Sequence, residues 1–268
     1  MFLLILLFPY GLAVDLSDIS LNSQAIKFPY VVSLGFMGQN TYIHRCSATI
    51  LTNQHVLTST QCVKDIHMDY DAETFNKKHG RVLVVVAGTG KIELPKMNNF
   101  TKIYLVKKIS VKMVDEKNHT DHLNIAVLKL EKKIEFNSRI RPIRLPVYRP
   151  PQSIFGKIVI TVDWNSNESD KKTRQLEMTE MKVLNNMNEK NECQGVKDRN
   201  HYCVKSIRSK SIKNCSRDLG GPMVYRDRNQ WLLYGIKTSE NNIKCESTSI
   251  YTMLPISLRW IFEQFKKL

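Results

Sequence analysis

The sequence is poor in glycine and in long apolar runs. It has only 11 glycines in 268 residues, and after the N-terminus no apolar stretch reaches the ~20 residues that a membrane helix needs. It also has no Cys-x-x-Cys pair, no cysteine and histidine spacing typical of zinc sites, no nucleic-acid-binding motif and no short repeat. These absences argue against a membrane span, a zinc module, another metal or cofactor site, and a nucleic-acid partner.

Basic residues are missing from the N-terminus. Residues 1–13 are uncharged and mostly apolar, and no lysine or arginine precedes Lys27. The run is too short to cross a bilayer and is typical of a secretory signal peptide, although such peptides usually begin with a basic residue. A buried N-terminal strand is the alternative interpretation. We predict a signal peptide at 1–13, a mature chain at 14–268 and secretion to the extracellular space.

Cysteines and sequons both suit an exported protein. An even number of cysteines in an oxidising compartment predicts three disulfides, but the count does not fix their pairing. Sequons at Asn99, Asn118 and Asn167 lie in polar, loop-like stretches, and we predict that they are glycosylated. A fourth, at Asn214, adjoins a cysteine and is expected to be enclosed. The cysteines are Cys46, Cys62, Cys193, Cys203, Cys215 and Cys245.

Acidic residues are few compared with basic ones. The chain has 40 Lys and Arg against 25 Asp and Glu, a formal net charge of +15. Such an excess favours acidic partners, namely sulfated glycans, anionic surfaces or acidic proteins. The alternative is that the lysines only keep the protein soluble.

The periodicity is that of an all-β protein. Short runs rich in Val, Ile, Thr and Tyr recur between turn residues. The stretch 142–152 holds four prolines and is typical of an extended linker, while the apolar spacing changes to a helical period at 256–267. The predicted strands lie within 30–36, 48–59, 81–88, 103–111, 123–130, 156–164 and 230–236.

From about residue 25 to its C-terminus, the chain resembles the trypsin/chymotrypsin-like serine proteases. Five segments, found in the family's order, carry this resemblance. Their order along the chain matches the family's first strand, histidine segment, aspartate strand, serine loop, and last strand with its helix. The segments are FPYVVSL (28–34), CSATILTNQHVLTSTQC (46–62), LNIAVLKLEKKIEFNSRIRPIRLP (123–146), CSRDLGGPMV (215–224) and SIYTMLPISLRWI (249–261).

The resemblance implies a fold and a set of disulfides. It implies two packed six-stranded antiparallel β-barrels, at about 25–141 and 152–253, followed by a C-terminal α-helix at about 256–267. The active-site cleft of the family lies between the barrels. The implied bridges are Cys46–Cys62, Cys193–Cys203 and Cys215–Cys245, a set similar to that of insect members.

The resemblance also places the catalytic positions, and all three are replaced. A serine hydroxyl needs an imidazole to take its proton, and the imidazole needs a carboxylate to orient it. The matching positions hold Gln61 for histidine, Asn124 for aspartate and Leu219 for serine. Loss of a whole triad costs about 10⁶-fold in turnover. The nearest histidines, His55 and His122, are expected to be solvated loop residues.

The supporting positions differ from the family as well. Arg217 replaces the oxyanion-hole glycine, and no basic cleavage site precedes the segment Ser17–Ser20 that stands where zymogen activation would act. Asp218, which the activated N-terminus would bind, remains, and we expect it to cap backbone N–H groups or to pair with a cation such as Arg217. The altered specificity-pocket positions are Lys213, Thr238, Ser239, Glu240 and Ser249.

We therefore predict a secreted, catalytically inactive protease homologue that acts by binding, as a cofactor, decoy or adaptor. Haemolymph immunity and seminal fluid are the settings known for such homologues, with an acidic extracellular protein, an active protease or its inhibitor as partner. The alternatives are a sulfated-glycan binder and, remotely, an active endopeptidase with unconventional residues. The glycan site would consist of Lys205, Arg208, Lys210, Lys213 and Arg217.

Overall fold

The computed structural model describes most of the chain from residue 25 onward. The described residues are 25, 27–39, 41–66, 70–92, 99–112, 124–166, 173–185, 200–207, 218–240 and 248–268.

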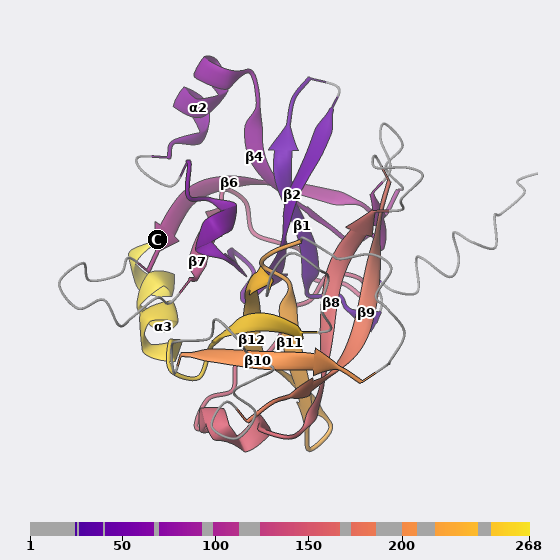
Figure 1. The fold of residues 1–268 in the computed structure, drawn as a ribbon. Helices are drawn as coiled ribbons and strands as arrows, with labels where there is room; N and C mark the ends of the chain where they lie inside the picture. The colour runs from indigo at the N-terminus through magenta and orange to yellow at the C-terminus, as the bar shows by residue number, and fades with distance from the viewer. Residues whose placement is uncertain are drawn as a thin grey trace, which may run out of the picture.

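Six strands of the N-terminal half close into an antiparallel barrel, in the upper half of the molecule in Figure 1. Their order around the barrel is β1-β2-β3-β7-β6-β4. The strands are β1 (Val31–Met37), β2 (Tyr42–Ile50), β3 (His55–Thr58), β4 (Val82–Ala87), β6 (Lys102–Val111) and β7 (Ala126–Leu130).

Six strands of the C-terminal half form a second ring in the order β10-β13-β12-β11-β8-β9, which the pairing of β9 with β10 closes. The predicted all-β class with two six-stranded antiparallel barrels is therefore confirmed. The helix predicted at 256–267 spans Leu258–Lys267 (α3). The strands are β8 (Ile158–Ser166), β9 (Arg174–Val183), β10 (His201–Ser206), β11 (Pro222–Asp227), β12 (Gln230–Glu240) and β13 (Thr248–Met253).

The Val-rich strand β4 shows how the barrels pack together. Its residues Leu83 and Val85 belong to the core inside the first barrel. The alternate residues Val84 and Val86 join a second cluster, which includes Trp164 of the second barrel. Successive side chains of a strand point to opposite faces, so β4 is buried on both faces because its outer face lies against the other barrel.

Two elements depart from the predicted pattern. The short strand β5 (Lys91–Ile92) comes from the first half of the chain but pairs with β9 of the second. A helix, α2 (Ala72–His79), begins where Asp71 accepts a hydrogen bond from the Thr74 N–H (2.9 Å) and ends at Gly80 with φ +62°. Two 3₁₀ turns, η1 (Thr60–Cys62) and η2 (Pro151–Ile154), complete the described elements.

One of the three implied disulfides lies wholly within the described residues. Cys46 and Cys62 are bridged, and they join β2 to η1. Cys203 is also in a disulfide, but its partner and the other cysteines, Cys193, Cys215 and Cys245, lie outside the described residues. Among the helices that the structure describes, none is long and apolar enough to cross a membrane.

The terminal helix α3 docks on the first barrel. Ile261 and Gln264 are buried, and the Ser110 hydroxyl donates to the Gln264 side-chain oxygen (2.7 Å). The His55 ring lies 4.9 Å from the Phe265 ring, centroid to centroid. His55 begins β3 and is only 8% exposed, so the prediction of a solvated loop histidine was wrong.

His55 predicts a pH dependence of stability. Burial, and then the positive charge of Lys129, lower its pKa below the ordinary value, which is about 6.5. The unfolded chain then binds the proton more tightly than the folded chain, so stability is full above about pH 6.5 and falls as the pH drops. Between about pH 7.5 and pH 5, the melting temperature of the wild type should fall more than that of His55→Gln. Parallel melting curves would contradict this assignment.

Candidate functional site

Gln61 and Asn124 meet at the edge of the first barrel. The Asn124 side-chain oxygen accepts hydrogen bonds from the Ser59 hydroxyl (3.1 Å) and from the Gln61 N–H (3.2 Å). The Thr60 N–H donates to the Asn124 carbonyl (3.4 Å). The Gln61 side chain is exposed. Two of the three predicted catalytic positions are thus neighbours, joined through the turn that contains the Cys62 disulfide.

The residues directly before β11 bring the third position to the same barrel. The Leu219 carbonyl accepts a hydrogen bond from the Ser47 N–H (2.9 Å), and the half-buried Leu219 side chain packs on the first-barrel core. Gly220 has φ +78°, and a Cβ there would lie 2.2 Å from the Ser47 carbonyl oxygen and 2.3 Å from the Thr58 hydroxyl. Only glycine fits this approach, which fixes the position of the loop beside β2 and β3.

The groups gathered here differ from those that the family reaction uses. Leu219 offers a hydrocarbon side chain, while Gln61 and Asn124 offer neutral amides. An amide does not accept a proton near neutral pH, and a hydrocarbon carries no lone pair to attack a carbonyl. The arrangement can therefore form hydrogen bonds and apolar contacts.

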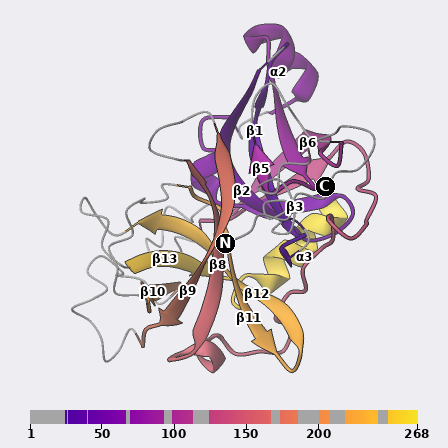
Figure 2. The same ribbon diagram turned by 90° about the vertical axis from the view of Figure 1, so that its right-hand side faces the viewer.

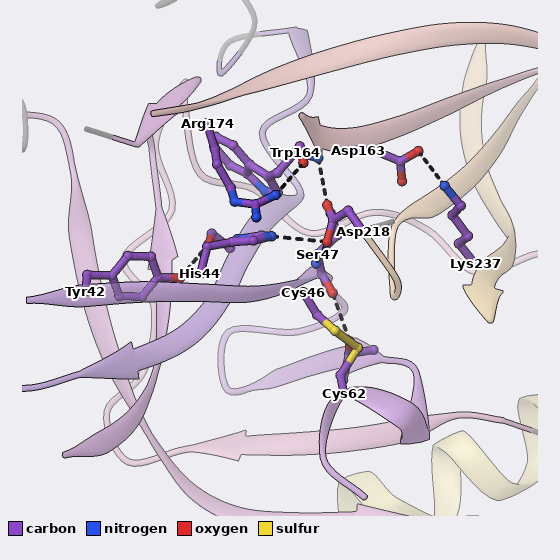
Figure 3. A network of polar contacts seen from close by, with 12 residues as sticks. Tyr42, His44, Cys46, Ser47, Cys62, Asp163, Trp164, Arg174, Asp218 and Lys237 are labelled. Atoms are coloured by element: carbon purple, nitrogen blue, oxygen red, sulfur yellow. Dashed lines mark hydrogen bonds and ion pairs between the residues drawn. A yellow bond between two sulfur atoms is a disulfide. The ribbon is translucent and has the colours of Figure 1, made fainter. Parts of the chain in front are cut away.

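Asp218, next to Leu219, is the most heavily bonded side chain of the site (Figure 3). One oxygen accepts from the Ser47 N–H (2.7 Å) and lies 3.2 Å from Nε2 of His44. The other accepts from the Ser47 hydroxyl (2.5 Å) and the Trp164 N–H (2.7 Å). The residue is 4% exposed. Its carboxylate therefore joins β2 of the first barrel to β8 of the second.

The imidazole of His44 is itself held in place. Its Nδ1 lies 2.6 Å from the Ser33 hydroxyl, which in turn lies 2.5 Å from the Tyr42 hydroxyl. Because an ionised carboxylate only accepts hydrogen bonds, Nε2 of His44 is the donor to Asp218.

The pKa of Asp218 reflects two opposed effects. Burial raises this pKa. The Coulombic attraction of His44 and the hydrogen bonds from His44, Ser47 and Trp164 all lower it, and together they outweigh burial. The net direction is a pKa below the usual range, so the carboxylate is charged in the folded protein.

The contacts of Asp218 match one of its two predicted roles and add a partner that was not predicted. It caps backbone N–H groups, as one predicted alternative stated, and its ionisable partner among the described residues is His44. Arg217, the predicted cation, lies outside them. Sequence reasoning missed His44 because 174 residues separate it from Asp218, and no local spacing signals such a pair.

The specificity-pocket positions are described only in part. Thr238 is buried, and its hydroxyl donates to the Ile250 carbonyl (3.5 Å). Ser249 lies half-buried on β13. Next to this wall, Lys237 Nζ lies 3.3 Å from an oxygen of Asp163, and both side chains are largely buried. The positions whose side chains lie outside the described residues are Lys213, Ser239 and Glu240.

Several other predicted sites also lie largely outside the described residues. Asn99 is exposed, as a glycosylated residue must be, whereas Asn118 and Asn167 are not described. Of the basic loop, Lys205 lies on β10, and the other four predicted glycan contacts, Arg208, Lys210, Lys213 and Arg217, fall outside. Within the described residues, no group of three His, Cys, Asp or Glu side chains could hold a metal ion.

Comparison with known proteins agrees with this architecture. The sequence profile of the family described as Trypsin matches residues 20–261. The chain is also 23% identical over 230 residues to "Phenoloxidase-activating factor 1" of Holotrichia diomphalia, which covers 76% of this chain and 57% of that relative. The chain thus spans little more than half the length of this relative.

The Asp218 network predicts a large loss of stability on truncation. Asp218→Ala leaves the Trp164 N–H, the Ser47 hydroxyl and the His44 ring without this acceptor, and breaking such a buried pair costs about 3–5 kcal/mol. Urea unfolding should show this loss, with a melting temperature lower by roughly 10 °C.

The control is Asp65→Ala, which removes the half-exposed partner of Arg45 and should cost less than about 1 kcal/mol. Equal losses in the two variants would show that Asp218 does not hold the barrels together.

Proposed function

This chain belongs to the trypsin family of serine proteases, and we propose that it is a non-catalytic member that acts by binding. One observation carries the proposal. Gln61 and Asn124 are hydrogen-bonded neighbours, and Leu219 packs on the core of the same barrel. The sequence resemblance assigns these two amides and this hydrocarbon chain to the positions where the family reaction needs an imidazole, a carboxylate and a hydroxyl.

The proposed role is that of a secreted cofactor, decoy or adaptor in an extracellular process. Both barrels, the Cys46–Cys62 bridge and the loop at Gly220 keep the family's shape, so a protease substrate, inhibitor or partner protease could dock without being cleaved. The relative from Holotrichia diomphalia bears a name that describes activation of phenoloxidase. That name supports haemolymph immunity as the setting, with reproduction as the other candidate.

The excess of positive charge favours a second candidate function, binding of a sulfated glycan. The net charge is +15, and charge complementarity would draw the protein to heparin-like chains. Neutralising Lys205, Arg208, Lys210, Lys213 and Arg217 together should shift elution from a heparin column to clearly lower salt. Elution at the same salt as a variant with five lysines neutralised elsewhere would reject the loop as the glycan site.

The non-catalytic proposal predicts that single-residue repair fails. Leu219→Ser restores a hydroxyl but leaves no base, since Gln61 cannot take its proton. Neither the wild type nor Leu219→Ser should react with a fluorophosphonate probe or hydrolyse a panel of peptide substrates.

An active trypsin serves as the positive control, and the variant Gln61→His/Asn124→Asp/Leu219→Ser tests whether the cleft accepts a full triad. Stoichiometric labelling of the wild type would overturn the proposal.

A further inference from the structure

A pocket lies at the outer end of the second barrel, away from the degenerate catalytic positions. It forms between residues 144–149 of the linker and the β11–β12 hairpin, and its volume is about 340 Å³. The hairpin is the lower tip of the molecule in Figures 1 and 2. The Leu233 N–H donates to the Arg144 carbonyl (2.9 Å), so the linker is fixed against the hairpin rather than lying loosely over it.

The lining of the pocket is positively charged. It holds Arg144, Arg149 and Arg228 against a single acidic residue, Asp227, for a net charge of +2. Arg149 pairs with Asp227 (2.8 Å), and Arg144 donates to the Gln230 side-chain oxygen (3.0 Å). Within the described residues, the Arg228 side chain forms no hydrogen bond or ion pair. The pocket therefore has guanidinium donors to spare for an anion.

Both turns that border the pocket hold large side chains in an unfavourable backbone conformation. Arg228 and Asn229, at the hairpin tip, have φ of +43° and +69°, and Tyr148 has φ +59°. These are all of the described non-glycine residues with positive φ. The left-handed region costs a residue with a Cβ about 1–2 kcal/mol. Tyr148 is nonetheless 95% exposed, so no packing among the residues that the structure describes explains why a bulky aromatic side chain lies there.

The pocket also has apolar walls. Leu145, Val147 and Leu232 line it beside the arginines, and Tyr148 lies between two lining residues. Arginine and tyrosine next to a small apolar wall are the residue types that dominate the energetics of protein interfaces. A sulfated sugar has little apolar surface to place against such walls, whereas a peptide has both acidic and apolar side chains.

We propose that this pocket binds an acidic segment of a protein partner, with a carboxylate side chain against Arg228 and Arg144 and an apolar side chain against Val147 and Tyr148. This inference rests on the proposed binding function and names a docking surface for it. Arg149 remains paired with Asp227 and orients the wall. None of the residues that line the pocket is a predicted catalytic position or a predicted glycan contact.

The test uses the purified full chain and a fluorescein-labelled peptide, Glu-Glu-Phe-Glu-Glu, with Gln-Gln-Phe-Gln-Gln as the uncharged comparison. Fluorescence anisotropy is measured for the wild type, Arg228→Gln and Arg226→Gln. Arg226 is the matched control because its side chain belongs to the opposite face of the hairpin. Asp227 and Gln230 form one cross-strand pair and line the pocket, whereas Arg226 and Trp231 form the neighbouring pair. Neighbouring residues of a strand point to opposite faces.

We expect the acidic peptide alone to bind the wild type, Arg228→Gln to weaken that binding about tenfold, and Arg226→Gln to change it less than twofold. Arg228→Gly removes the same charge and also the backbone strain, so it should weaken binding while leaving melting temperature equal or higher. This variant separates loss of the site from loss of the fold.

Three results would overturn the proposal. The first is no binding of the acidic peptide, and the second is equal weakening by Arg228→Gln and Arg226→Gln. The third is binding of a heparin oligosaccharide that depends on Arg228 and that the peptide does not displace. Fluorophosphonate labelling of the same preparation separates this proposal from the non-catalytic one. Labelling would overturn the absence of catalysis whatever the peptide does, and failure of the peptide without labelling would remove only the docking surface.

Discussion

The buried carboxylate of Asp218 is the contact on which the joining of the two barrels depends. A charged group out of water is strongly unfavourable unless every lone pair finds a donor. Its donors come from His44 and Ser47 on β2 and from the Trp164 backbone on β8. The carboxylate is satisfied only when both barrels present these strands together, so it favours a single relative placement of the two halves.

Steric contacts beside Asp218 fix the backbone of the loop that carries Leu219. Gly220 and Gly221 lie where a Cβ would come within 2.2 Å of the Ser47 carbonyl and of Asp163, respectively. Their backbone positions are set by steric contact and by the neighbouring Asp218, neither of which involves the side chain at 219. The loop can therefore keep its path with a leucine at 219, whose side chain adds apolar contact with the first-barrel core.

The sequence was informative where physical signals are local. Apolar runs such as 81–88 predicted strands, and five ordered segments predicted both barrels and the neighbourhood of Gln61 and Asn124. It could not place contacts set by tertiary packing. The bond between His44 and Asp218 joins positions far apart in the chain, β5 pairs across the halves, and His55 is buried by a helix that begins two hundred residues later. No short-range period encodes these contacts.

The use of glycine distinguishes the outer pocket from an ordinary surface. Gly80 and Gly156 have φ of +62° and +72°, and a Cβ at either would meet nothing within 4 Å, so backbone conformation alone accounts for glycine there. Tyr148 and Arg228 adopt the same left-handed region. The chain thus places glycine at two open turns of this conformation but not at the two turns beside the arginine-lined pocket. At Arg228 and Asn229 the two-residue hairpin turn itself requires positive φ, so the unusual feature is the choice of arginine over glycine there, and this choice supports the proposed docking surface.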